Sequence, residues 1–301
     1  MPDLANIVPW WGYSLLFSLL WPINIEANRH FQVDGQVLIV WRALACGLLL
    51  LPAALFAPWP TSPYFYFFLA VSALLFSYQE CEAFKLSKIY GGLFLTLQSV
   101  LWILTATILW WVIDPDSLKA LMSHPLSSGF VLCGILLGVS AQFFLRSGKV
   151  GFYTKDLNKI LFMGVVGGTA VTCVKLGMSY TDTFLSVFVW NALNNLLIGV
   201  FNSMRYGLTR RRHNIPPLAE AKSIKAGIFM GFIMALCAPL IVLSLAAAPN
   251  PGFSNMVAQL SSVWLYLYCR WAHKPINVHL LGLVLTVAAA LFLIMGTSLF
   301  H

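Results

Sequence analysis

The chain has 301 residues, of which 59% are hydrophobic and only 9% charged, and its formal net charge is +8. A soluble globular domain is about half apolar and about one quarter charged, so this composition excludes an ordinary soluble domain and indicates a polytopic membrane protein. The six cysteines form no Cys-x-x-Cys pair, and we interpret them as small apolar side chains rather than disulfides or metal ligands. The first residues, MPDLANIV, lack a basic segment, so we expect no removable signal peptide.

Ten apolar segments follow one another along the chain. A helix needs about 20 apolar residues to cross the hydrocarbon core of a bilayer. Windows of this length predict transmembrane helices at residues 8–28, 37–57, 63–82, 91–113, 126–145, 159–179, 183–204, 224–247, 252–270 and 277–298. The connections are short and rich in Pro, Asp, Lys and Arg, as turns between neighbouring helices are. The sequence therefore predicts an all-α protein embedded in the lipid bilayer, without a separate soluble domain.

Lys and Arg are unevenly distributed between the two sets of loops. They gather after the first, third, fifth, seventh and ninth segments, and the run RRRHNIPPLAEAKSIK from residue 210 is part of this set. The opposite side has only Lys119 among several aspartates. The positive-inside rule then places both termini outside the cytoplasm, and we expect a multi-pass protein of a bacterial inner or plasma membrane. Orientation explains the basic charge better than nucleic-acid binding, which we do not expect.

The first segment carries a carboxylate, Glu26, in the stretch LLWPINIEANRHF. Ionisable residues are costly in a bilayer and usually mark a functional pathway. VWRALACGLLL from Val40 resembles VWNALNNLLIG from Val189, and the same offset of 149 residues carries Glu26 onto Lys175 in the sixth segment. We therefore expect Glu26 and Lys175 to pair between two halves of the protein, either along a substrate pathway or as a structural ion pair.

This internal repeat predicts the architecture. With five helices in each half, an odd number, the second half enters the membrane in the opposite sense. Residues 1–150 and 151–301 are then two inverted five-helix repeats, and a binding site is expected near the midplane between them.

The second and third segments hold further candidates. Trp41 lies deeper than most tryptophans, which sit near segment ends as aromatic belts do, and we expect it to face a substrate. Arg42 is either a snorkelling anchor or an interior residue. Glu80 is a second candidate proton carrier, whereas Glu82 precedes Lys85 by three residues and predicts a local helical ion pair.

The second half adds amide side chains at helical spacing. Gly164, Gly168 and Thr172 form a stripe of small and polar residues with Lys175, and close helix packing explains the glycines. Further residues fall on common faces of the seventh and ninth segments. The candidates there are Trp190, Asn191, Asn194 and Asn195 in the seventh segment, and Gln259 with Asn255 and Ser262 in the ninth. Several such faces together predict a polar central cavity.

The chain resembles the drug/metabolite transporter superfamily over its whole length, and three stretches carry the resemblance. They are LLWPIN in the first segment, EAFKLSKIYGGLFLTLQSVL, and PGFSNMVAQLSSVWLYLYCRWAHKPINVHLLGLVLTVAAALFLIMG at the close. The resemblance implies a ten-helix inverted-repeat carrier that works by alternating access, and Glu26 matches the membrane-embedded glutamate that some members use for proton coupling. The chain departs from the family pattern after the fourth and ninth segments, where Asp114 is at best a substitute for a glutamate, and in its predicted orientation. The direction of transport therefore stays open.

The resulting hypothesis is a secondary transporter for a small polar or zwitterionic, amino-acid-like metabolite, coupled to protons through Glu26. Lys175 would bind an anionic group of the substrate, and the amides its neutral polar atoms. A multidrug efflux carrier and a non-transporting membrane scaffold or partner subunit are the alternatives. No GxSxG, HExxH or Cys-x-x-Cys spacing occurs, so we expect no enzyme activity, metal or cofactor. Both halves lie in one chain, so either a monomer or a homodimer satisfies the hypothesis.

Overall fold

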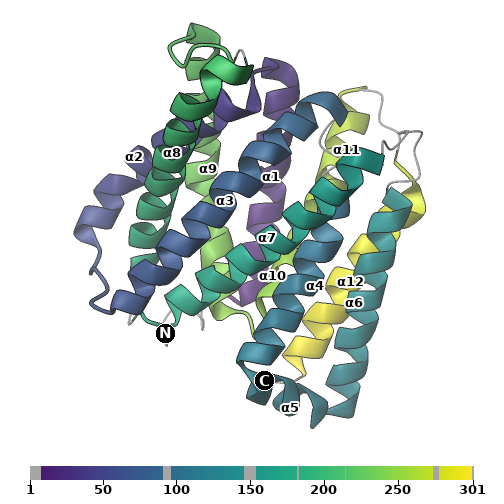
Figure 1. Cartoon of the computed structure of the whole chain (residues 1–301). Coiled ribbons are helices and arrows are strands. Elements are labelled where there is room, and N and C mark those ends of the chain that lie inside the picture. The colour runs from purple at the N-terminus through teal and green to yellow at the C-terminus, as the bar shows by residue number, and fades with distance from the viewer. Residues whose placement is uncertain are drawn as a thin grey trace.

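The computed structural model describes residues 8–90, 96–145, 154–181, 183–213, 215–273 and 278–299. These residues form a bundle of helices without strands, as the sequence predicted for an all-α protein (Figure 1). The helices are α1 (Trp10–Phe31), α2 (Gly35–Phe56), α3 (Pro63–Tyr90), α4 (Thr96–Ile113), α5 (Pro115–Met122), α6 (Pro125–Leu145), α7 (Thr154–Met178), α8 (Ser186–His213), α9 (Ala221–Ala247), α10 (Pro251–Ala258), α11 (Ser261–Trp271) and α12 (Leu280–Ser298).

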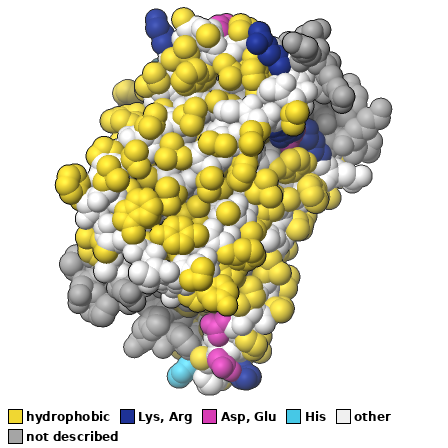
Figure 2. Space-filling view, turned by 60° about the vertical axis from the view of Figure 1, so that its left-hand side comes forward, with side chains coloured by type: hydrophobic (Ala, Val, Ile, Leu, Met, Phe, Trp, Pro, Cys, Tyr) yellow, Lys and Arg dark blue, Asp and Glu magenta, His cyan; other side chains and the backbone are white. Residues whose placement is uncertain are grey.

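Six helices of the described part are long and apolar enough to cross a membrane. They are α2, α6, residues 157–178 of α7, residues 186–210 of α8, α9 and α12, and the pair α4–α5, bent by 99°, makes a seventh if it is one broken span. Hydrophobic side chains cover most of the face in Figure 2, and the charged side chains lie mainly toward its two ends, with Asp and Glu beside a basic side chain at the lower end. These features are compatible with a multi-pass integral membrane protein, while the full set of ten spans stays a prediction.

Two predicted elements differ from the structure. The expected helix at 252–270 is broken at Gln259 and Leu260, which separate α10 from α11. The short helix α5 was not expected, because it lies in the connection between the predicted segments 91–113 and 126–145. Asp114 accepts a hydrogen bond from the Ser117 N–H at 3.2 Å, and Pro115 occupies the first helical position. Both residues favour a helix start, so the same signals that end α4 begin α5.

Glycines allow close approach where helices cross. In the antiparallel pair α2–α8, a Cβ on Gly47 would lie 2.7 Å from Leu196, and one on Gly199 would lie 2.7 Å from Leu44. In the parallel pair α4–α7, a Cβ on Gly168 would lie 2.6 Å from the Trp102 carbonyl oxygen. α6 packs on α12 along one edge of the bundle, and α2 also packs on α9. Small residues at these contacts let the helix backbones approach closely, as they do between helices in membranes.

The first and the last described helix each have one end near α5. The start of α1 lies beside the end of α9, because Ser244 donates to the Trp10 carbonyl oxygen at 2.8 Å. The end of α12 lies beside the start of α6, since a Cβ on Gly296 would be 3.0 Å from the Ser127 carbonyl oxygen. Both sites adjoin the end that carries α5 with Asp114 and its other charged residues. The described ends of the chain therefore lie on the same side of the bundle.

At the opposite end, one carboxylate gathers three cations from three helices. Glu82 of α3 is buried and accepts hydrogen bonds from Lys85 at 3.0 Å and Arg205 of α8 at 2.6 Å, and it also pairs with Lys159 of α7. The predicted local pair with Lys85 is therefore confirmed. The partners from α7 and α8 were not foreseen, because sequence spacing reports only contacts within one helix.

We expect Glu82→Gln to lower the free energy of unfolding by about 1–3 kcal/mol. Removing one partner of a buried ion pair costs about 3–5 kcal/mol, and here the cations are about one third exposed, so screening reduces the effect. Asp116→Asn is the matched control, because the Lys119–Asp116 pair spans 2.8 Å but its side chains are 75% and 87% exposed. Chemical unfolding in detergent measures both variants. Equal effects of the two substitutions would contradict a structural role for the Glu82 cluster.

Candidate functional site

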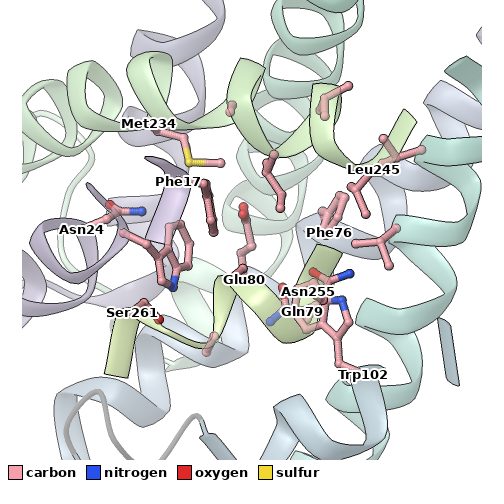
Figure 3. Close-up of a pocket in the computed structure, with 18 of the residues that line it drawn as sticks. Phe17, Asn24, Phe76, Gln79, Glu80, Trp102, Met234, Leu245, Asn255 and Ser261 are labelled. Carbon is pink, nitrogen blue, oxygen red and sulfur yellow. The ribbon is translucent and has the colours of Figure 1, made fainter. Parts of the chain in front are cut away.

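A cavity lies in the interior of the bundle, between eight helices from both ends of the sequence. It encloses an empty volume of about 1560 Å³ including its opening (Figure 3). Its wall combines two kinds of side chain. The aromatic residues are Phe17, Trp21, Phe76, Phe84, Trp102 and Trp190, and the amides are Asn24, Gln79, Gln98, Asn191, Asn194, Asn195, Asn255 and Gln259. Such a mixture of flat apolar surfaces and fixed polar groups is typical of a site for a small organic molecule.

α1 presents one face to the cavity. Phe17, Trp21 and Asn24 line it and recur every three or four residues, which is the spacing of a single helix face. The rings of Phe17 and Trp21 stack with centroids 5.2 Å apart. Ser18, beside Phe17, accepts a hydrogen bond from the Trp264 indole of α11 at 3.0 Å, which fixes α1 against the broken helix.

Two tryptophans of the wall are seated on glycines of α7. A Cβ on Gly167 would lie 2.5 Å from the Trp102 ring, and a Cβ on Gly177 would lie 2.1 Å from the Trp190 ring. Only glycine leaves room for an indole at these positions. The six-membered rings therefore lie against the backbone of α7. Among the described residues, α7 itself contributes Val171 and Val174 to the wall.

The one ionisable side chain among the described lining residues is Glu80, which belongs to α3. Figure 3 shows it between Phe17 and Phe76. Its carboxylate pairs with Arg42 of α2, whose side chain is 0% exposed. The Arg42 guanidinium also lies over the Phe84 ring, 5.4 Å from its centroid. Arg42 is therefore an interior residue behind the cavity wall and not a snorkelling anchor.

Some amides of the wall are fixed by hydrogen bonds, and the side-chain oxygens of several have no partner in the described part of the chain. Asn191 and Asn195 donate their Nδ2 hydrogens to carbonyl oxygens one turn earlier in α8, at 2.8 and 2.9 Å. The side-chain oxygens of Asn24, Gln79, Gln98 and Asn195 have no hydrogen-bond partner among the described residues. A buried acceptor without a partner costs free energy, so these positions favour a ligand that brings hydrogen-bond donors.

The break between α10 and α11 borders the same cavity. Gln259 ends α10, and the turn that follows uses hydrogen bonds across three residues, from Leu260 N–H to Val257 at 3.1 Å and from Ser262 N–H to Gln259 at 3.0 Å. Ser261 and Ser262 then begin α11 and also line the cavity. Discontinuous helices of this kind are tolerated in a membrane where they face a cavity, because protein and ligand satisfy the backbone there.

Eight of the eleven residues expected at the site line the cavity. They are Glu80, Trp190, Asn191, Asn194, Asn195, Asn255, Gln259 and Ser262. The structure brings these residues together from α3, α8 and the broken helix α10–α11. Trp41, Glu26 and Lys175 are not among the described lining residues.

Trp41 and Glu26 lie on other helix faces. The Trp41 indole donates to the Leu218 carbonyl oxygen at 2.8 Å, and its Cβ packs on Gly227 of α9, so it joins α2 to α9 outside the cavity. Glu26 follows Asn24 by two residues, which rotates it by about 200° around α1 and away from the cavity face. The helical spacing of Trp21 and Asn24 in the sequence already indicates that Glu26 lies on another face of α1.

The expected pair of Glu26 with Lys175 is wrong. Lys175 donates to the carbonyl oxygens of Leu245 and Ala246 at 3.3 Å, and to that of Ala248 at 2.5 Å, at the end of α9. This is the end of the bundle where α1 begins, and Glu26 is near the other end of α1. α1 and α7 run in opposite directions, so equivalent positions near the ends of the two helices lie at opposite ends of the bundle.

We expect Lys175→Met to destabilise the protein without changing the charge preference of the cavity. The ammonium caps the buried carbonyl groups that end α9 and lies 4.7 Å from the centroid of the Trp110 ring. Each buried carbonyl left without a donor costs about 1–3 kcal/mol, so unfolding should become easier by at least that amount. Chemical unfolding compared with Lys119→Met, which alters a 75% exposed side chain, measures the effect. A changed preference between cationic and anionic solutes would contradict this prediction and show that Lys175 acts on the solute.

Sequence reasoning did not assign several residues of the wall. Phe17, Asn24, Phe76, Gln79, Gln98 and Trp102 were not singled out. A signal was present in each helix, because Phe76, Gln79 and Glu80 share a face of α3, and Gln98 and Trp102 share a face of α4. Aromatic residues are common on lipid-facing surfaces as well, so the spacing alone does not separate the two environments.

No protein-family model and no curated protein sequence matches the chain. A solved structure described as "Crystal structure of protein" is similar in fold, with a TM-score of 0.66 and 13% sequence identity, and the match covers 94% of this chain and 96% of that chain. At this identity the match concerns the fold alone. The similarity extends over nearly the full length of both chains, so the helical arrangement described above is one that a second protein also adopts. Among the described residues, no group of three His, Cys, Asp or Glu side chains is placed to hold a metal ion.

Proposed function

We propose that the chain is a secondary transporter that moves a small polar solute across a membrane by alternating access. The observation that carries the proposal is the interior cavity, whose polar wall lies inside a bundle with an apolar surface. Buried polar groups are costly, and a scaffold that only spans the membrane does not need eight amides around a cavity. The resemblance to drug/metabolite transporters points to the same function.

The proposal includes two inverted halves, residues 1–150 and 151–301, with ten spans. The helix pairings support this symmetry: α1 packs on α9 and α7 on α3, α2 on α9 and α8 on α3, and α4 on α7 and α10 on α1. In each of these three comparisons, the second contact follows from the first when α1, α2, α3 and α4 are exchanged for α7, α8, α9 and α10. Gly47 of α2 and Leu196 of α8, which meet at the crossing, are separated by the same 149 residues as Val40 and Val189.

Orientation and location complete the proposal. We place the Glu82 cluster at the cytoplasmic end and both termini on the opposite side, because cytoplasmic loops of membrane proteins carry an excess of Lys and Arg. A bacterial inner or plasma membrane fits this reading. The proposal does not include an amino-acid-like substrate, because Lys175, the expected partner of a substrate carboxylate, donates to carbonyl oxygens at the end of α9.

Transport is tested by uptake of labelled solutes into vesicles that contain the purified protein. We expect saturable uptake and exchange of an internal for an external solute, both reduced in Trp102→Ala and Asn194→Ala at equal amounts of protein. Trp271→Ala is the control, because Trp271 is 80% exposed and lies outside the cavity. Uptake equal to that of empty vesicles for every solute would reject the proposal. A proton gradient across the same vesicles tests the predicted coupling, which Glu26→Gln should abolish.

A further inference from the structure

The charge of the cavity wall is fixed by one ion pair. Glu80 is the single carboxylate in the described lining, and no Lys, Arg, His or Asp side chain lines it. Arg42 stands behind Glu80, fully buried, and in the described part of the chain its only hydrogen-bond partner is the Glu80 carboxylate. The guanidinium Nε and Nη1 atoms have no hydrogen-bond partner among the residues that the structure describes. The carboxylate and the guanidinium therefore neutralise each other where a solute would contact Glu80.

Other charged residues are held away from the wall. Lys175 is engaged by carbonyl groups at one end of the bundle, and Glu82 holds its three cations at the other. What remains around the cavity is neutral: amide groups, three serines and aromatic rings. Four of the amides have oxygens without a partner in the described part of the chain, and these oxygens accept hydrogen bonds and carry no charge.

We propose that the Arg42–Glu80 pair is a charge filter, which makes this cavity select ring-containing solutes that carry several hydrogen-bond donors and no net charge, such as a nucleoside or a monosaccharide. A cation would be attracted by Glu80 but repelled by Arg42, and an anion would meet the reverse, so neither recovers the hydration it loses on entry. An uncharged ring stacks on the tryptophans and donates to the free amide oxygens. This inference deepens the proposed transport function, and it names Arg42 and Glu80 as the residues that determine specificity.

The charge filter predicts that removal of either charge alone changes which solutes the cavity binds. Arg42→Met leaves an uncompensated carboxylate at the wall and should favour cations. Glu80→Gln leaves an uncompensated guanidinium behind the wall and should favour anions. The double variant Arg42→Met with Glu80→Gln has neither charge and should prefer uncharged solutes again. Specificity changes of this kind follow from the unpaired charge that each variant introduces.

Binding is measured by calorimetry in detergent with three solutes of nearly equal size: nicotinamide, 1-methylnicotinamide and nicotinate, which are neutral, cationic and anionic. We expect the natural protein to bind nicotinamide at least tenfold more tightly than either ion. Arg42→Met should bind 1-methylnicotinamide most tightly and Glu80→Gln should bind nicotinate most tightly, by a similar factor. Each variant is first checked for a cooperative thermal transition, and if one single variant does not fold, the other single variant and the double variant still test the reversal.

The outcomes separate this inference from the transport proposal. An unchanged order of the three solutes in the folded variants would overturn the filter, as would tighter binding of an ion by the natural protein, or no binding by any folded variant. Reversal of the order in detergent together with no uptake into vesicles would support the filter and reject the transporter. Uptake whose charge preference is the same in all variants would support the transporter and reject the filter.

Discussion

Glu80→Gln is expected to lower the free energy of unfolding by about 3–5 kcal/mol, one of the two largest effects that we predict. Arg42 is 0% exposed, and loss of its carboxylate partner leaves a buried, uncompensated charge, which is the costly step in breaking a buried ion pair. The aromatic face of Phe84, 5.4 Å from the guanidinium, compensates only a small part of it. Chemical unfolding in detergent measures the difference from the natural protein.

A double-mutant cycle isolates the pair. Arg42→Met should cost about as much as Glu80→Gln, but the double variant should cost much less than the sum, because replacing a whole buried pair by neutral side chains is often close to neutral. Asp116→Asn, which removes an exposed pair, is again the control. Additive effects of the two substitutions would show that Arg42 and Glu80 do not interact in the folded protein, and would also remove the basis of the charge filter.

The sequence predicted the polar faces of single helices well. Asn191, Asn194 and Asn195 share a face of α8 by spacing alone, and all three line the cavity. Most predicted segments also became helices, because an apolar run of about 20 residues leaves the backbone few alternatives in a membrane. Such inferences need only the periodicity of one helix, which a single sequence contains.

Contacts between helices were harder to predict. The offset of 149 residues identified Glu26 and Lys175 as equivalent, but both lie far from the middle of their helices. Equivalent positions meet near the midplane, as Gly47 and Leu196 do, whereas those near the helix ends lie at opposite ends of the bundle. Arg42 and Glu80, which do pair, are 38 residues apart on α2 and α3 and share no repeat position. Their contact depends on how these two helices pack, which neither composition nor spacing determines.

The break in the ninth segment shows another limit. Positions 259 and 260 are Gln and Leu and not glycine or proline, so the sequence lacks the usual signals for a helix end there. The break is a tertiary feature: hydrogen bonds across three residues replace those across four, and the side chains of Gln259, Ser261 and Ser262 line the cavity. Sequence periodicity placed Gln259 at the site correctly, although the shape of the backbone around it was not predictable.

Gly168→Leu is expected to prevent formation of the native bundle. A Cβ at this position would lie 2.6 Å from both the Thr105 Cβ and the Trp102 carbonyl oxygen, and 3.0 Å from the Ala106 backbone nitrogen. Two of these contacts are with the backbone of α4, which has no side-chain rotamer to change, so α4 and α7 must separate. The smaller Gly168→Ala should still cost about 1–3 kcal/mol, as overpacking does in other cores.

The matched control is Gly207→Leu, in α8, because a Cβ there meets nothing within 4 Å. Leucine also has a higher helix propensity than glycine, so this variant should be as stable as the natural protein or slightly more stable. The yield of monodisperse protein and its thermal transition in detergent compare the two leucine variants. Because Trp102 of α4 lines the cavity and lies on Gly167 of α7, separation of these helices should remove solute binding together with stability. A stable Gly168→Leu variant that still binds solute would contradict both the helix contact and the position of the cavity.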